Sequence, residues 1–245
     1  MGLISNGSTI FDNGSMASGF GGNMVFIKKL TASASATLSF VDGSDGVVLD
    51  DTYKEYVFTF NNMHSSDNGH FQFNMSIDSG SNYNVTKTTS YFEAVHDEAD
   101  SATSLAYKTA RDLAQSTGYQ ILANEVGTDN DQNASGTLTI YNPSSTVFVK
   151  HFIANFNSTY SADYTVGNDN DQNICGEMFL YNPSSTTFVK HYMATILDTT
   201  HDNYSITSYV AGYCNVTAAI DGVQFSMNSG NIDSGKIKLY GIKDS

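Results

Sequence analysis

The strongest constraint on the fold is a tandem repeat in the second half of the chain. Residues 127–166 align with residues 167–206 without a gap, and 20 of the 40 positions are identical. Unrelated segments of ordinary composition agree at about one position in 15, which would give about three matches here. The segment is therefore a tandem duplication, and each copy is expected to fold as the same unit.

Each copy has the pattern of a β-hairpin. A polar loop, "GTDNDQN" or "GNDNDQN", precedes a strand, "GTLTIYN" or "GEMFLYN", and a returning strand follows, "TVFVKHFIA" or "TTFVKHYMA". A β-turn should join the strands, because proline fixes φ near about −65° and lacks an N–H that this corner does not need. The turn has asparagine first and proline second: Asn142 and Pro143, or Asn182 and Pro183. The returning strand is apolar on both faces, which predicts a place within a sheet.

The remaining sequence also favours antiparallel strands. Short runs rich in β-branched and aromatic residues begin at Met24: "MVFIKKLT", "ATLSFVD", "KEYVFTFN", "HFQFNMSI" and "YNVTKTTSYF". In "HFQFNMSI", residues 71, 73, 75 and 77 are apolar and alternate with polar residues, as in a half-buried strand. Turn signals at 42–46, 65–69 and 78–82 separate the runs. We predict a single all-β domain over residues 24–245, a size at which no disulfide is needed for stability.

One segment is ambiguous. Residues 99–118, "ADSATSLAYKTARDLAQSTG", could form a helix with Asp100 or Ser101 as N-cap and Gly118 as its stop. The apolar face of such a helix is thin, so an irregular crossover is the equal alternative.

Residues 1–23 are rich in glycine, asparagine and serine and contain few apolar residues. They cannot bury enough apolar surface to order themselves alone. We expect either a mobile terminus or an N-terminal docking arm whose apolar residues order against a partner: Leu3, Ile4, Ile10 and Phe11. This start lacks the pattern of a signal peptide, and no run of about 18 apolar residues predicts a transmembrane helix.

The charge balance excludes one class of partner. Acidic residues number 25 against 11 basic ones, which gives a net charge of −14, and Arg111 is the only arginine. Nucleic-acid binding needs clustered Lys and Arg, so a nucleic-acid partner is not expected. The two cysteines, Cys175 and Cys214, form no CxxC pair, and packed thiols are favoured over a disulfide bridge.

The duplicated polar loops are weak candidates for a metal site. They place acidic and amide side chains at alternate positions: Asp129, Asp131 and Asn133, then Asp169, Asp171 and Asn173. An EF-hand loop needs glycine at its sixth position and glutamate at its twelfth, and neither is present. Solvated turns are therefore favoured, and we predict no metal or other cofactor.

No catalytic motif is convincing. His151 and His191 occupy equivalent positions in the repeat and could share a metal, although a buried histidine bonded to a backbone carbonyl is favoured. The segment "HDEAD" contains His96, Asp97, Glu98 and Asp100, but carboxylates without a nucleophile usually form a solvated loop. We predict that the protein is not an enzyme.

Several phrases together resemble a known family. They are "LISNGSTIFDNG", "TASASATLSFVDGSDGVVLDDTY", "GNDNDQN", "NPSSTTFVKH" and the closing "AIDGVQFSMNSGNIDSGKIKLYGI", which is the most specific. Over nearly its whole length the chain resembles virion structural proteins of marine tailed bacteriophages. This resemblance implies a β-sandwich or jelly-roll module on the exterior of the virion, as a capsid decoration, head fibre or tail-fibre component. It also implies a homo-oligomer, commonly a trimer, that contacts other virion proteins and carries no enzymatic residues.

Two other functions remain open. The exposed loops could bind host surface glycans, as at a fibre tip, or the chain could be a glycan hydrolase that uses Asp97, Glu98 and Asp100. A hydrolase would need two carboxylates about 5–10 Å apart across a cleft.

The duplication also predicts a limit on strand pairing. The second copy of the repeat inserts extra strands into the chain. If the insertion adds two antiparallel strands, every later strand keeps its direction, whereas an insertion of three strands reverses every later strand. We therefore predict that "SADYTV" (161–166) and "DNYSIT" (202–207) do not both pair fully with the duplicated hairpins.

Overall fold

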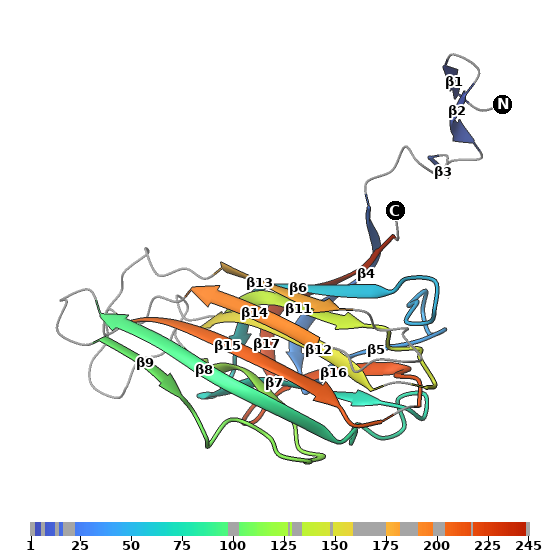
Figure 1. Ribbon diagram of the computed structural model, residues 1–245. Coiled ribbons are helices and arrows are strands. Elements are labelled where there is room, and N and C mark those ends of the chain that lie inside the picture. Colours follow the sequence, from blue (N-terminus) through green and yellow to red (C-terminus); the bar gives the residue numbers. More distant parts are fainter. Residues whose placement is uncertain are drawn as a thin grey trace.

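The computed structural model consists of β-strands joined by turns and loops (Figure 1). It describes residues 3–5, 8–12, 15–16, 23–97, 103–126, 128, 134–147, 149–158, 175–181, 191–197, 204–216 and 218–243. Most strands belong to two antiparallel sheets, one of eight strands and one of four. The predicted all-β class and the antiparallel β-sandwich are confirmed, and the jelly-roll connectivity stays a prediction.

The larger sheet has two free edges in the described residues, β4 at one side and β9 at the other. Its strands, in spatial order, are β4 (Met24–Ser35), β17 (Ile232–Ile242), β6 (Glu55–Ser65), β11 (Ala134–Tyr141), β12 (Lys150–Ser158), β15 (Tyr204–Cys214), β8 (Lys87–Asp97) and β9 (Thr103–Tyr107). The smaller sheet has the order β10 (Gln120–Val126), β7 (Gly69–Ser76), β16 (Gly222–Met227) and β5 (Thr37–Val41).

Phenylalanine rings join the two sheets. Phe58 of β6 lies 5.4 Å from Phe225 of β16, measured between ring centroids, and Phe73 of β7 lies 4.7 Å from Phe152 of β12. All four rings are fully buried. Edge-to-face contacts of this kind contribute about 0.5–1.5 kcal/mol each beyond the area that the rings bury. Buried phenylalanine side chains from both sheets therefore form the centre of the core.

The alternation predicted for residues 70–77 is confirmed on its apolar face within β7, but the strand is not half-buried, because Asn74 and Ser76 on the opposite face are buried as well. Phe71, Phe73 and Met75 are buried, whereas Ile77 lies after the last residue of the strand and is exposed. The turn expected at 78–82 begins there, with Ser79 and Gly80 both at positive φ. The turn, rather than the alternation, decides where Ile77 lies.

The first copy of the repeat lies in the middle of the large sheet. β11 and β12 pair along their whole lengths, from Ala134 opposite Ser158 to Tyr141 opposite His151. At the predicted corner, the Ser145 N–H donates to the Asn142 carbonyl oxygen at 3.1 Å, with Pro143 second in the turn. β12 lies between β11 and β15, as expected for a strand that is apolar on both faces.

The second copy forms a separate two-stranded sheet. β13 (Cys175–Tyr181) and β14 (His191–Leu197) pair in the register of the first copy, with Tyr181 opposite His191. This hairpin lies against β11, β12 and β15 (Figure 1). The large sheet therefore contains one copy of the repeat and carries the other on its surface. The second proline turn, at Asn182 and Pro183, lies outside the described residues.

The hairpin explains why β11 is buried on both faces. Leu138 and Ile140 point into the core, while the opposite face of β11 and β12 is also buried at Thr137, Thr139 and Ile153. Only a covering layer can remove both faces of a strand from water, and the β13–β14 hairpin lies against this face.

The helical alternative for residues 99–118 is wrong for the part that is described. Residues 103–107 form β9, which pairs with β8, and the Arg111 N–H donates to the Lys108 carbonyl oxygen at 3.0 Å in a turn. Residues 108–119 then cross irregularly to β10 in the other sheet. Pairing with β8 satisfies the backbone, and a helix with so thin an apolar face could gain little by packing.

The N-terminal segment contains a small sheet of its own, formed by β1 (Leu3–Ser5), β2 (Ser8–Asp12) and β3 (Ser15–Met16). Figure 1 shows these strands apart from the sandwich, beyond the start of β4. Leu3 pairs with Phe11, so β1 and β2 bring two of the four predicted arm residues opposite each other.

Candidate docking site

The outer face of β4 and β17 carries a mixed apolar and basic surface. Ile237 and Leu239 of β17 point into the core, so the alternate residues of that strand face outward. Register then places Phe26 opposite Tyr240 and Lys29 opposite Lys238. We call this the β4–β17 surface, and it comprises Met24, Phe26, Lys29, Lys236, Lys238 and Tyr240.

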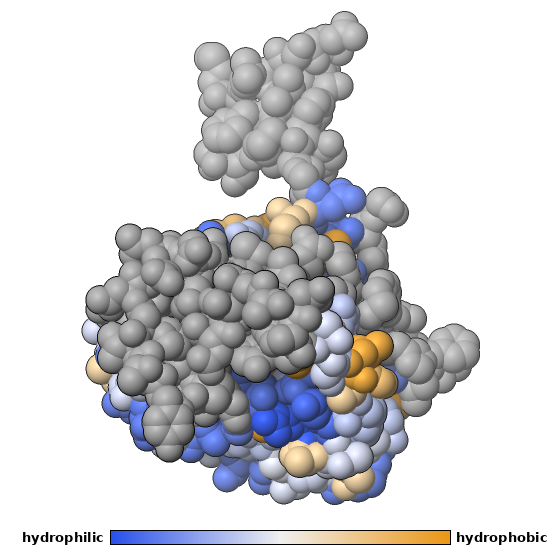
Figure 2. Space-filling model, turned by 90° about the vertical axis from the view of Figure 1, so that its left-hand side faces the viewer, coloured by the Kyte–Doolittle hydropathy of each residue, from blue (hydrophilic) through white to orange (hydrophobic). Residues whose placement is uncertain are grey.

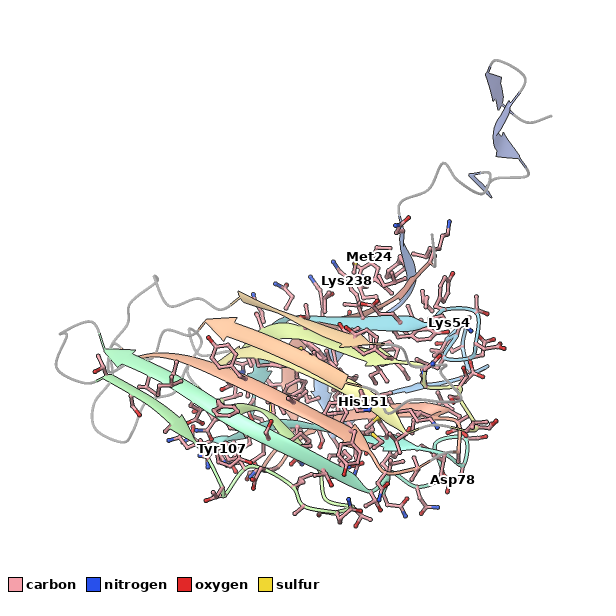
Figure 3. The ribbon with its side chains drawn as sticks, viewed as in Figure 1. Met24, Lys54, Asp78, Tyr107, His151 and Lys238 are labelled. Atoms are coloured by element: carbon pink, nitrogen blue, oxygen red, sulfur yellow. The ribbon has the colours of Figure 1, made fainter. Side chains whose placement is uncertain are left out.

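Its apolar part is exposed. Phe26 is 56% exposed and Met24 is 46% exposed, and the Phe26 ring meets the edge of the Tyr240 ring at 5.7 Å. Exposed aromatic and apolar side chains that gather on one face commonly mark a contact surface. The surface lies where the chain leaves the N-terminal sheet and enters the sandwich (Figure 3).

Its basic part is electrostatically strained. Lys29 and Lys238 are direct cross-strand partners, and like charges in that position destabilise a sheet. Lys28, by contrast, points to Asp45, with its Nζ 2.5 Å from the carboxylate. An acidic partner would relieve the repulsion between Lys29 and Lys238. The β4–β17 surface is therefore suited to binding a partner with a negatively charged surface.

A second exposed apolar group lies at the other edge of the sheet. Phe92 of β8 pairs with Tyr107 of β9, and their rings meet edge to face at 5.0 Å. Leu105 of β9 is 77% exposed. The Tyr107 hydroxyl donates to the Asp112 carboxylate, which raises the pKa of Tyr107. We call Phe92, Leu105 and Tyr107 the β8–β9 surface; Figure 2 faces this end of the sandwich and shows hydrophobic atoms exposed beside hydrophilic ones.

An ion cluster lies beneath this second surface. The side chain of Glu93 is only 3% exposed and contacts Lys108 Nζ at 2.9 Å and Arg111 Nε at 3.5 Å. Burial, and then the charge of Arg111, lowers the pKa of nearby His70. The cluster holds the turn after β9 against β8, which gives it a structural role. The cluster was not predicted from the sequence, although a glutamate inside the apolar run "YFEAV" is a signal for it.

Two buried lysines flank Cys214. Lys87 of β8 and Lys150 of β12 are the cross-strand neighbours of Cys214 on β15, and all three are fully buried. Lys87 Nζ donates to Asn74 Oδ1 at 2.5 Å and to the Val85 carbonyl oxygen at 2.7 Å. Burial lowers the pKa of both lysines to about 8.

Cys214 is a thiol, as expected, and is not half of a disulfide. Its Sγ lies 3.7 Å from Met75 Sδ. Cys175 lies in β13, opposite Leu197.

The structure brings few of the predicted site residues together. His151 is buried, and its ring lies 5.8 Å from that of Tyr213, while His191 lies at the start of β14. Among the described residues, no three His, Cys, Asp or Glu side chains are grouped to hold a metal ion. The loop candidates Asp129, Asp131, Asn133, Asp169, Asp171 and Asn173 lie outside the described residues.

The "HDEAD" segment is described only in part. His96 and Asp97 form the end of β8, with Asp97 opposite Tyr204 of β15, whereas Glu98 and Asp100 lie outside the described residues. For the strand-pairing prediction, the "YSIT" part of 202–207 begins β15, whose Thr207 pairs with Asn157 of β12. Residues 161–166 lie outside the described part, so that prediction stays untested.

Comparison with known proteins gives no relative: no family model, no curated protein and no solved structure matches this chain. In the part of the chain that the structure describes, there is no helix with the length and hydrophobicity needed to cross a bilayer.

Proposed function

We propose that the chain is a non-enzymatic structural protein of a phage virion, displayed on the exterior of the capsid or tail and docked through its N-terminal arm. The observation that carries the proposal is the position of the N-terminal sheet, which is separate from the sandwich and followed directly by the exposed β4–β17 surface. An arm of this kind binds a neighbour while the sandwich remains accessible. The resemblance of the phrases quoted above to virion proteins supplies the biological setting.

The interior of the sandwich also supports a structural role. Its centre is filled with phenylalanine rings. Two buried ionisable groups of the interior have partners: Glu93 contacts Lys108 Nζ, and Lys87 Nζ donates to Asn74 Oδ1 and to the Val85 carbonyl oxygen. In both cases the partners hold the side chain in place within the fold, which suits a structural role.

Deleting residues 1–23 tests the proposal. The truncated sandwich should fold with the cooperative thermal unfolding of the full chain but should be absent from purified particles, because its docking segment is gone. Ile77→Asp, which changes an exposed residue beyond β7, is the matched control and should be incorporated normally. Normal incorporation of a folded truncated chain would refute docking through the arm.

The second candidate function is receptor binding. Tyr107 is an exposed ring beside the carboxylate of Asp112, a pairing of stacking surface and hydrogen-bond acceptor that suits a sugar. Glycan-array binding by the full chain that disappears in Tyr107→Ala would favour this role. Absence of binding to any glycan would count against it.

A further inference from the structure

The exposed apolar residues of the described chain are not scattered. Seven large hydrophobic side chains are exposed, and five of them lie in the two surfaces at opposite edges of the eight-stranded sheet. The other two, Ile77 and Val147, stand singly in connections between strands. Figure 3 shows Met24 and Lys238 at one edge and Tyr107 at the other.

Neither edge is built for strand addition. β4 has a bulge where its register with β17 shifts between Leu239 and Tyr240, and β9 has only five residues. Bulges, lysines and short strands are the devices that prevent edge-to-edge pairing. A partner at either edge would therefore contact the outward side chains rather than the backbone.

The β4–β17 surface is basic, and an acidic residue borders the β8–β9 surface. Lys29, Lys236 and Lys238 concentrate positive charge on the β4–β17 surface of a chain whose net charge is −14. Most described cations elsewhere are unavailable, because Lys87 and Lys150 are buried and Lys108 and Arg111 pair with Glu93. The β8–β9 surface offers apolar rings next to Asp112.

We infer that the chain associates with itself, the β4–β17 surface of one copy binding the β8–β9 surface of the next. Phe26 and Met24 of one copy then contact the β8–β9 surface of the next copy, which is the only other cluster of exposed apolar side chains in the described residues. The lysines of the first copy approach Asp112 of the next. The two surfaces differ, so the contact is heterologous and builds either a closed ring or an open chain of copies. This inference goes beyond the proposed function and does not rest on it, because it concerns the purified chain alone.

Analytical ultracentrifugation of the full chain tests the inference, with Phe26→Asp disabling one surface and Leu105→Asp the other. Wild type should associate between about 1 and 100 μM, and each variant alone should bind at least about tenfold more weakly. A mixture of the two variants retains one intact surface of each kind, so it should form a one-to-one dimer and nothing larger. Association of the wild type should weaken between about 0.05 and 0.5 M salt, because screening acts on exposed charges.

Ile77→Asp and Val147→Asp are the matched controls and should associate as wild type does, with circular dichroism showing that all variants are folded. The inference is overturned if the wild type stays monomeric across this range. It is also overturned if the two variants fail to form a dimer when mixed, or if the controls disrupt association as strongly as the surface variants. Particle incorporation is not measured, so failure here would leave the test of the arm unaffected.

Discussion

At the scale of single residues, the buried lysines show how the interior treats charge. Lys87 is fully buried, and no carboxylate is among the hydrogen-bond partners of its Nζ, which are an amide oxygen and a carbonyl oxygen. Such a site favours the neutral amine, which is why the pKa of Lys87 falls to about 8. In the unfolded chain the pKa of Lys87 is about 10.4. Between about pH 8 and pH 10.4, Lys87 is therefore mostly neutral in the folded state and mostly charged in the unfolded state.

This difference predicts a dependence of stability on pH. Because the folded pKa is lowered, the folded state binds fewer protons than the unfolded state above about pH 8, and stability rises with pH there. Between pH 7 and 9.5 the free energy of unfolding of the wild type should rise by about 1–2 kcal/mol more than that of Lys87→Met. Urea denaturation at the two values measures it.

Lys29→Met is the control for that measurement, because Lys29 is exposed on β4 and should leave the wild-type slope unchanged. Equal slopes in the wild type and Lys87→Met would show that Lys87 keeps its proton in the fold.

At the scale of elements, the two copies of the hairpin have the same local structure and different places. β11–β12 and β13–β14 share their register, yet only the first pairs with β6 and β15. Local sequence sets the hairpin, whereas the strands on either side decide which copy enters the sheet. β15 pairs directly with β12, so the β13–β14 hairpin that lies between them in the sequence is not part of the large sheet.

Deleting residues 161–200 should therefore leave the sandwich intact. The deletion joins Tyr160 to His201, removes one period of the repeat and leaves five residues, 159, 160 and 201–203, between β12 and β15. Such a length suits a hairpin loop. Unfolding should remain cooperative, with a lower Tm because Ile153 and the outer face of β11 lose their cover.

Hydrogen exchange provides the decisive readout for this deletion. Amides of β12 and β15 should stay protected, because their pairing does not involve the deleted residues. Loss of that protection, or of cooperative unfolding, would show that the second hairpin is needed to form the sheet.

At the scale of the whole molecule, one core holds two sheets together, and five of the seven large hydrophobic side chains exposed in the described residues lie at the edges of the larger sheet. Phe225 of the small sheet contacts Phe58 and Phe60 of the large one, at 5.4 and 5.0 Å. The deletion of residues 1–23 and the paired edge variants examine the arm and the two edge surfaces separately.

The sequence by itself determined the strand character of the chain, its turns and the hairpin of the repeat. The proline corner at Pro143 and the turn at 78–82 are local patterns, and each is satisfied by residues close in the chain. The segment 99–118 was ambiguous, because a thin apolar face cannot decide between a helix and pairing with β8.

Only the tertiary structure decided which buried positions are polar and which apolar ones face water. Lys87, Cys214 and Lys150 come from strands far apart in the chain and meet because β8, β15 and β12 are neighbours. Phe26 and Leu105 are exposed because their strands are the two edges of the sheet, with no layer over them in the described residues. Strand order depends on contacts between distant segments, and no local pattern of residues encodes it.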